Sequence, residues 1–234
     1  MNIIITGASS GVGFEAALEL TLTNAHNVIA IARSQDKLAR LLDIAKGINP
    51  ECNLFPVAFD IVHDDYADLK QFIGARFDDN IDALINNAGV LINKPFAQLE
   101  ETDFVDMLQS NYLGHVRIIQ ALIPLMPAGS HILNIGSMGG FQGSAKFVGL
   151  SAYSASKAAL HVLTECLAQE LTEQQIKVNC LALGSAQTEM LEKAFPGYES
   201  PIMAFEMGKY IADFALTGHK FFNGKILPVA LSTP

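Results

Sequence analysis

Short apolar runs alternate with amphipathic stretches along the whole chain, and this alternation constrains the fold more than any other feature. The runs are apolar almost throughout, which is typical of strands buried on both faces in a parallel sheet covered by helices. The expected strands are 2–6, 27–32, 53–59, 81–86, 131–136, 176–182 and 225–230, and the expected helices are 12–23, 34–46, 64–77, 101–126, 151–172 and 201–217. Regular strand–helix alternation predicts a doubly wound α/β sheet of the Rossmann type, with right-handed crossovers.

The composition fits a single domain over residues 1–234. Half of the residues are hydrophobic and 17% are charged, a balance typical of chains that form a core. Lysine and arginine number 15 against 24 acids, so the net charge is −9. Because such a surface repels phosphate backbones and anionic lipid headgroups, we expect no nucleic-acid partner and no membrane partner.

The remaining bulk features predict a cytoplasmic protein. The N-terminal residues show no basic segment followed by a small-residue cleavage site, and no apolar run is long enough to span a bilayer. The cysteines, at positions 52, 166 and 180, are scattered, which favours reduced thiols over disulfides. The histidines show no metal-ligand spacing, so no metal site is expected.

A glycine-rich turn, Thr6-Gly-Ala-Ser-Ser-Gly-Val-Gly13, separates the first expected strand from the first helix. Gly7 permits a tight turn, Gly11 lets the backbone approach a pyrophosphate, and Gly13 lets the helix pack closely on the sheet. Free amides at the helix start supply donors for an anion. The turn therefore predicts a dinucleotide site formed by Gly7, Ser9, Ser10, Gly11, Val12 and Gly13. The alternative is an ordinary turn of glycine and serine.

Four further segments follow the glycine turn in order. They are Asn86-Asn87-Ala88-Gly89 after the fourth strand, Asn111 in the long helix, Ser137 after the fifth strand, and Tyr153-Ser-Ala-Ser-Lys157 at the start of the next helix. Together with the turn, they resemble the short-chain dehydrogenase/reductase family from Met1 to about Thr188. The resemblance implies a seven-stranded, mostly parallel sheet, a nicotinamide cofactor, and a catalytic tetrad of Asn111, Ser137, Tyr153 and Lys157.

The residue types of this tetrad suit proton transfer to a carbonyl oxygen. Tyr153 and Lys157 are four residues apart on a helix, so they share a face, and a nearby ammonium is expected to lower the tyrosine pKa from its usual value of about 10. Ser137 is expected to hydrogen-bond the substrate oxygen. In the family, the residue at Asn111 holds a water that links the lysine to solvent. The alternatives are a turn serine, an asparagine bonded to its own neighbourhood and a surface tyrosine.

The residue after the second strand points to NADP(H) rather than NAD(H). NAD-binding proteins of this fold often place an acid there, whereas this chain has Arg33, which can pair with a 2′-phosphate. Ser10, often basic in NADP-specific relatives, is uncharged here, and Arg33 as a solvated surface group is the alternative. The resemblance also places Asp60 near the adenine, residues Asn87, Ala88 and Gly89 along the cofactor, and Thr188 beside the nicotinamide.

Three segments depart from the family pattern. A glycine-rich insertion lies between Ser137 and Tyr153, Leu183-Gly184 replaces the usual Pro-Gly, and the stretch 189–201 is short for a substrate-covering loop. The resemblance implies a small-molecule carbonyl or alcohol substrate, and these departures leave the identity of that substrate open.

We expect an enzyme that transfers a hydride between NADP(H) and a carbonyl or alcohol, because the tetrad is intact. The alternatives are a catalytically inactive NADP(H)-binding sensor or scaffold, and an epimerase or dehydratase of the same fold. The expected helices 101–126 and 151–172 carry apolar residues that one sheet face cannot obviously bury, namely Phe104, Met107, Leu108, Leu160, Leu163 and Leu167. A homodimer or homotetramer built on these helices is predicted, and a monomer is the alternative.

Overall fold

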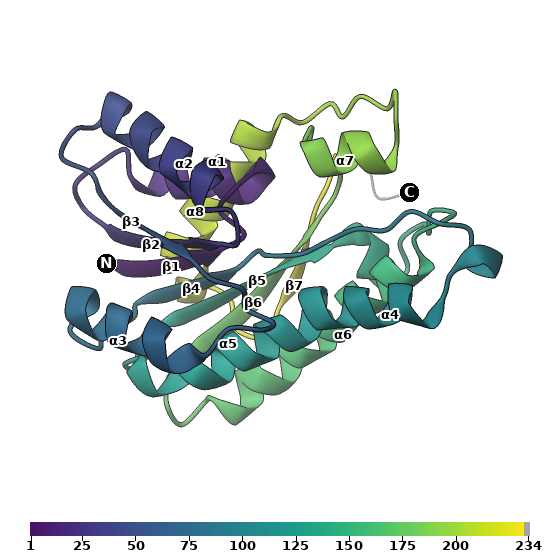
Figure 1. Cartoon of the computed structure of the whole chain (residues 1–234). Helices are drawn as coiled ribbons and strands as arrows, with labels where there is room; N and C mark the ends of the chain where they lie inside the picture. Colours follow the sequence, from purple (N-terminus) through teal and green to yellow (C-terminus); the bar gives the residue numbers. More distant parts are fainter. Residues whose placement is uncertain (232–234) are drawn as a thin grey trace.

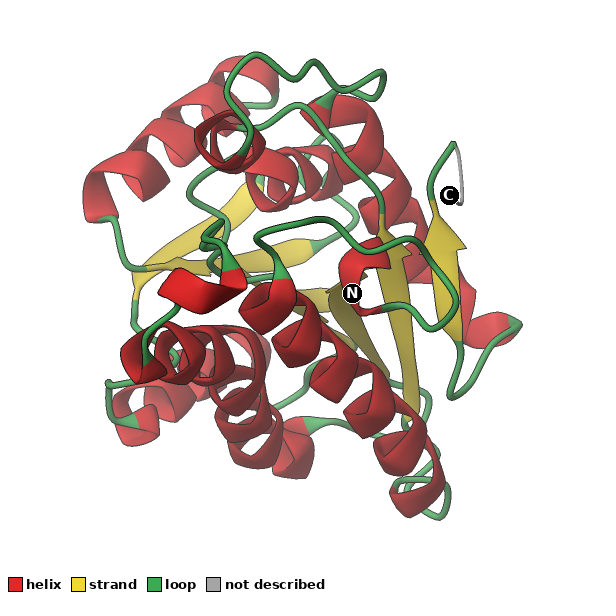
Figure 2. Cartoon of the chain, turned by 90° about the vertical axis from the view of Figure 1, so that its right-hand side faces the viewer, coloured by secondary structure: helices red, strands yellow, loops and turns green. Residues whose placement is uncertain are grey.

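The computed structural model describes residues 1–231 and contains one seven-stranded sheet, in the order β3-β2-β1-β4-β5-β6-β7. The strands are β1 (Asn2–Thr6), β2 (Asn27–Ala32), β3 (Asn53–Ala58), β4 (Ala83–Asn86), β5 (His131–Ser137), β6 (Lys177–Leu183) and β7 (Ile226–Val229). Every neighbouring pair is parallel. The predicted Rossmann-type α/β fold is confirmed, and the sheet is parallel throughout (Figure 2).

Helices cover both faces of the sheet (Figure 1). One layer consists of α1 (Gly11–Leu20), α2 (Gln35–Ile48) and α8 (Ala204–Thr217), and the other of α3 (Tyr66–Phe77), α5 (Gly114–Leu122) and α6 (Ser151–Glu170). Side chains of β1 alternate between the two cores, with Ile3 and Ile5 on the first side and Ile4 on the second. The apolar runs are strands because both faces of the sheet are buried in this way.

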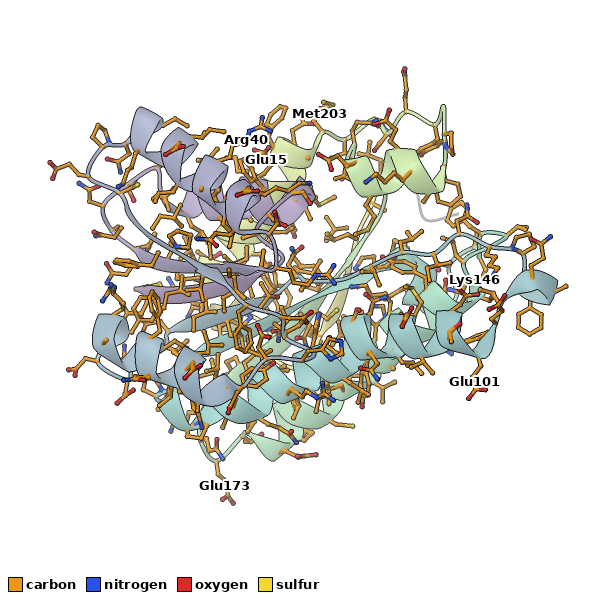
Figure 3. The ribbon with its side chains drawn as sticks, in the orientation of Figure 1. Glu15, Arg40, Glu101, Lys146, Glu173 and Met203 are labelled. Carbon is orange, nitrogen blue, oxygen red and sulfur yellow. The ribbon has the colours of Figure 1, made fainter. Side chains whose placement is uncertain are left out.

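Helix α1, which begins at the glycine turn, is covered by the much later helix α8. A Cβ atom on Gly208 of α8 would lie 2.8 Å from the backbone nitrogen of Ala16, so only glycine permits this close approach. Lys209 of α8 also contacts Glu19 of α1, with 2.9 Å between Nζ and Oε1. Figure 3 shows Glu15 of α1 on the side of the molecule where Met203 precedes α8. Helices α1 and α8, which are distant in sequence, thus pack against each other in one helical layer.

The helical region expected over 101–126 is present from Glu101 to Leu125, but it is not one uniform α-helix. The structure has α4 (Glu101–Leu108), a π-helical segment (Gln109–Leu113), α5 and a 3₁₀ turn (Ile123–Leu125). The π turn inserts one extra residue around Asn111, which a hydrophobic pattern of constant period cannot reveal. Pro124 explains the tightened end, because it cannot donate the helical hydrogen bond.

A short helix, α7 (Glu189–Ala194), occupies part of the stretch that the sequence analysis treated as a loop. Thr188 caps it, since its Oγ1 accepts from the backbone N–H of Leu191 at 3.2 Å. Its first turn carries Glu189 and Glu192, which favour a helix N-terminus. The following helix, expected from 201, begins only at Ala204.

Two of the apolar residues proposed for a subunit interface are core residues instead. Met107 and Leu160 are both 0% exposed, so they cannot touch a partner. Leu108 is 40% exposed, and Val105 on α4 and Val162 on α6 are exposed as well, at 43% and 58%. The apolar surface on these helices is therefore smaller than the sequence suggested, and the predicted homodimer or homotetramer stays a prediction.

Candidate active site

The glycine turn lies at the carboxyl end of β1, where the sheet order passes from β2 to β4. Gly7 and Gly11 have φ angles of 71° and 59°, which side chains rarely adopt. A Cβ atom on Gly7 would lie 2.7 Å from the Cα of Ala88, and one on Gly13 would lie 2.5 Å from the carbonyl oxygen of Gly7. The Ser10 side chain makes no cap hydrogen bond at the start of α1. This cradle, with uncapped helix amides above it, fits a dinucleotide pyrophosphate.

The Asn87 side chain bonds to the glycine turn. Its Nδ2 donates to the carbonyl oxygens of Thr6 and Gly7, at 3.0 and 3.2 Å. The hydroxyl of Thr6 in turn accepts from the backbone N–H groups of Asn87 and Ala88, both at 3.0 Å. The segment after β4 therefore fixes the shape of the turn, and the Asn87 side chain is used for that purpose rather than left free for a ligand.

A cavity of about 1050 Å³ begins at this turn and runs along the carboxyl ends of the strands. Nearly all of the predicted site residues line it, namely Gly7, Ser9, Ser10, Gly11, Val12, Gly13, Arg33, Asp60, Asn87, Ala88, Gly89, Ser137, Tyr153, Lys157 and Thr188. A ligand outside the carboxyl ends of parallel strands, beside the first strand, is the arrangement expected for a doubly wound sheet. Asn111 is the exception, because it does not line the cavity.

Three of the predicted catalytic residues meet where α6 passes the end of β5. Lys157 is buried, and its Nζ donates to the carbonyl oxygen of Ile135 at 2.8 Å. The same nitrogen lies 6.0 Å from the ring centroid of Tyr153, one helical turn earlier. Ser137 ends β5, and its Oγ accepts from the backbone N–H of Gly139 at 3.1 Å. A hydroxyl, a phenol and an amine thus face one cavity.

Burial controls the ionisation of this group. It raises the pKa of Tyr153 above its usual value, and a hydrogen bond with Ser137 offsets part of that rise. Burial likewise lowers the pKa of Lys157 to about 8, with a small opposing effect from Cys180. The expected lowering of the tyrosine pKa by the ammonium is not seen, because burial of the phenol is the largest influence on this pKa and raises it.

Asn111 lies behind the cavity wall, fully buried in the π-helical segment. Its Oδ1 accepts from the N–H of Val90 at 2.8 Å, and its Nδ2 donates to the carbonyl oxygen of Val90 and the hydroxyl of Ser156, both at 3.0 Å. A Cβ atom on Gly89 would lie 2.8 Å from this Oδ1 and 3.6 Å from the Nζ of Lys157. Gly89 thus lies next to both Asn111 and Lys157. The expected role of Asn111 in holding a water stays a prediction.

The polar end of the cavity lies at β2 and β3. Arg33 follows β2 and is exposed, and the ion pairs of residues 1–231 do not include it. Asp60 follows β3, and its Oδ1 accepts from the backbone N–H of Val62 at 2.8 Å. At the opposite side, the methyl group of Thr188 lies 3.3 Å from the position of a Cβ on Gly11. Helix α7 therefore begins directly against the glycine turn.

The family of this chain follows from its similarity to known proteins. Residues 1–199 match the sequence profile described as short chain dehydrogenase. The chain belongs to the short-chain dehydrogenase family. It spans 63% and 65% of the length of two of the curated relatives that it matches.

Two curated relatives and one solved structure illustrate the likeness. The chain is 34% identical over 193 residues to a fatty acyl-CoA reductase of Acinetobacter baylyi, covering 80% of this chain and 63% of that protein. It is 32% identical over 207 residues to an NADP-dependent 3-hydroxy acid dehydrogenase of Schizosaccharomyces pombe, covering 84% and 75%. A 7α-hydroxysteroid dehydrogenase solved with NADH superposes with a TM-score of 0.87 at 24% identity, covering 97% and 92%. This last likeness concerns the fold alone.

This short-chain dehydrogenase also has cavity residues that the sequence reasoning missed. They are apolar and come from three segments, and they include Leu91, Ile92, Phe147, Leu150, Met190 and Phe195. The rings of Phe147 and Phe195 meet edge to face, with centroids 6.5 Å apart, so the 138–150 insertion touches the end of α7. Lys146 lies on the same insertion, at the end of the molecule where Glu101 begins α4 (Figure 3). The apolar residues inside the glycine-rich insertion and the 189–201 stretch were the available signal.

Two further findings concern what the described residues do not contain. Within residues 1–231, no three His, Cys, Asp or Glu side chains are grouped so that they could hold a metal ion. Across the same range, no helix has both the length and the apolar character needed to cross a bilayer.

Proposed function

We propose that this short-chain dehydrogenase transfers a hydride between NADP(H) and a carbonyl or alcohol substrate, with Tyr153 as the general acid and base. The observation that carries the proposal is the meeting of Ser137, Tyr153 and Lys157 on the wall of the cavity that begins at the glycine turn. A cradle for a dinucleotide and a proton-transfer group in one cavity are what a nicotinamide-dependent oxidoreductase needs.

In the reductive direction, a nicotinamide cofactor held at the glycine turn would supply the hydride for the carbonyl carbon. The Tyr153 hydroxyl gives its proton to the carbonyl oxygen, while the Ser137 hydroxyl donates a hydrogen bond to the same oxygen and orients it. Lys157 is held by the carbonyl oxygen of Ile135, so its amine stays beside the phenol as the proton leaves. In the oxidative direction, Tyr153 accepts the proton of the alcohol.

The preference for NADP(H) rests on Arg33. Its side chain is exposed at the cavity end next to β2, where a guanidinium can pair with a 2′-phosphate. The relative from Schizosaccharomyces pombe is named as NADP-dependent, which supports the proposal, whereas the steroid dehydrogenase of the same fold was solved with NADH. Arg33 is thus the residue of this chain that favours one cofactor over the other.

The direct test is oxidation of NADPH by the purified protein with a panel of ketones and aldehydes, followed by absorbance. Tyr153→Phe is expected to reduce kcat by about 10²–10⁴-fold, the usual contribution of general acid catalysis, while NADPH affinity measured by fluorescence stays within about twofold. Near-full activity in Tyr153→Phe would show that another group is the acid. Tight NADPH binding without turnover of any carbonyl compound would favour the sensor or scaffold alternative.

A further inference from the structure

A row of buried polar side chains joins β4, β5 and α6 inside an otherwise apolar layer. Asn86, Asn134 and Thr164 are each 0% exposed. Asn86 Nδ2 donates to Asn134 Oδ1 at 2.9 Å, and Asn134 Nδ2 donates to Thr164 Oγ1 at 2.9 Å. The Thr164 hydroxyl donates to the carbonyl oxygen of Leu160 at 2.9 Å. Burying amides is costly unless they are paired, so this row requires an explanation other than packing.

The row does not look like a device for stability alone. Asn86 and Asn134 are register partners across the parallel pair β4–β5, so an apolar pair at these positions would extend the core on both strands. At the far end, Asn86 Oδ1 has no hydrogen-bond partner among residues 1–231. An unpaired buried oxygen is destabilising, whereas leucine or valine would add buried apolar surface. What the polar row provides instead is a set of directional hydrogen bonds that join β4, β5 and α6.

A second polar contact joins the same helix to the same strand, closer to the active site. The backbone N–H of Ser137 donates to Nε2 of His161 at 3.4 Å. The imidazole also packs on Gly136, where a Cβ atom would overlap Nε2, and its ring meets Phe141 edge to face. His161 is only 6% exposed. Burial is the main cause that lowers its pKa, to about 4, and the nearby Lys157 lowers it further, so the ring stays neutral and able to accept.

These contacts lie on the face of α6 that carries the reacting groups. Tyr153, Lys157, His161 and Thr164 are spaced by four, four and three residues, which places them on one face of a helix. From this face, Lys157 binds Ile135, His161 binds Ser137 and Thr164 binds Asn134, all on β5. Helix α6 therefore contacts three residues of one strand through directional bonds.

We propose that Thr164 and His161 are positioning residues, which fix the register of α6 along β5 so that Tyr153 meets Ser137. Apolar contacts are non-directional, and one residue of axial slip on a helix is only about 1.5 Å. A hydrogen bond tolerates far less displacement before it is lost. The inference rests on the proposed function in one respect, which is that Tyr153 and Ser137 act on the same substrate oxygen.

The test is Thr164→Val beside Thr164→Ser. Valine keeps the shape but removes the acceptor of Asn134, whereas serine keeps the hydroxyl. We expect Thr164→Val to reduce kcat by about 10–100-fold, as a displacement near 1 Å does, with little change in KM for NADPH, and Thr164→Ser to stay within about threefold of wild type. Thr21→Val is the matched control, because its buried hydroxyl also donates to a helix carbonyl, that of Leu18 at 2.7 Å, far from α6.

A readout independent of turnover is the titration of Lys157, followed by NMR of ¹³C-labelled lysine and assigned with Lys157→Met. In wild type the pKa of Lys157 is lowered to about 8 by burial. Loss of register in Thr164→Val frees the amine from Ile135 and admits water, so its pKa rises toward the ordinary value, while Thr164→Ser and Thr21→Val leave it unchanged. If no carbonyl compound is turned over, the proposed function fails, and this titration still decides the positioning role.

A second pair of variants, at His161, keeps the proposal testable if Thr164→Val does not fold. His161→Leu removes the acceptor of the Ser137 N–H, and His161→Gln keeps one. We expect the leucine variant to lose kcat and the glutamine variant to recover most of it. The proposal is overturned if Thr164→Val matches Thr21→Val in kcat and keeps the Lys157 pKa of wild type. It is equally overturned if the conservative variants, Thr164→Ser and His161→Gln, are as impaired as their apolar counterparts.

Discussion

Gly13→Ala is the substitution that most directly tests the cofactor cradle. The added Cβ would lie 2.5 Å from the carbonyl oxygen of Gly7 and would overlap the Nδ2 of Asn87. These are the two atoms that bond to each other at 3.2 Å, so the methyl group separates a donor from its acceptor. Displacement of Nδ2 would also weaken its hydrogen bond to the carbonyl oxygen of Thr6. Because the obstacle includes backbone at a turn with positive φ, the neighbours cannot simply rotate away.

The magnitude follows from overpacking and from the two bonds. Overpacking costs about 1–3 kcal/mol and each of the two lost hydrogen bonds about 0.5–1.5 kcal/mol, so we expect roughly 2–6 kcal/mol of lost stability. For a domain of this size, 1 kcal/mol corresponds to about 2–4 °C in Tm, which predicts a decrease of roughly 4–24 °C. NADPH affinity, measured by fluorescence titration below the melting range, should fall at least about tenfold, because the uncapped amides of α1 are displaced.

Gly47→Ala is the matched control. Gly47 lies in the last turn of α2, and a Cβ atom there would meet nothing within 4 Å. The same substitution should therefore raise stability by about 0.4–1 kcal/mol and leave NADPH affinity unchanged. A Gly13→Ala protein with the Tm of wild type, or with the NADPH affinity of wild type, would refute this account of the turn.

Three further predictions concern other parts of the molecule. Arg33→Ala should weaken NADPH binding by about tenfold or more and leave NADH binding unchanged, while Arg40→Ala on α2 should change neither; equal losses for both cofactors would contradict the proposed 2′-phosphate contact. Burial is the main cause that lowers the pKa values of His115, His131 and His161, to about 3, 4 and 4. The unfolded chain therefore binds more protons than the folded chain between pH 6.5 and 4, and the free energy of unfolding should fall by about 1.4 kcal/mol per pH unit per proton as the pH falls through that range. A Tm that does not change over this range would contradict the prediction, and His131→Gln should reduce the slope. Val162→Glu on α6 should split the predicted homodimer in light scattering, whereas Ile48→Glu, similarly exposed on α2, should not; a monomeric wild type would end the assembly hypothesis.

The sheet and the residues at its carboxyl edge were predictable because they depend on local pattern. Strands buried on both faces read as uninterrupted apolar runs, and glycines with positive φ stand where a turn must leave a strand. Ser137, Tyr153 and Lys157 were instead singled out by the resemblance to a known family, and each lies at the end of a strand or on the first turns of the helix that follows. Their shared cavity then follows from the parallel order of the strands.

What the sequence could not give depends on tertiary contacts. The π turn at Asn111 is held by bonds to Val90 and Ser156, which lie 21 and 45 residues away. The ionisation of Tyr153 is set by desolvation, which cannot be judged before burial is known. Helix α7 was missed because its six residues are too few for helical periodicity to register, although Thr188 was there as a cap.

The packing of α8 on α1 has a consequence for how this protein is made. The face of α1 that α8 covers includes Glu15 and Ala16, only a few residues after the glycine turn. A ribosome releases α1 well before residues 204–217 emerge, so the nascent chain carries an incompletely supported glycine turn during that interval. Chaperones would meet an exposed apolar side of α1 during that interval, and ligand-assisted folding could begin only after α8 has emerged.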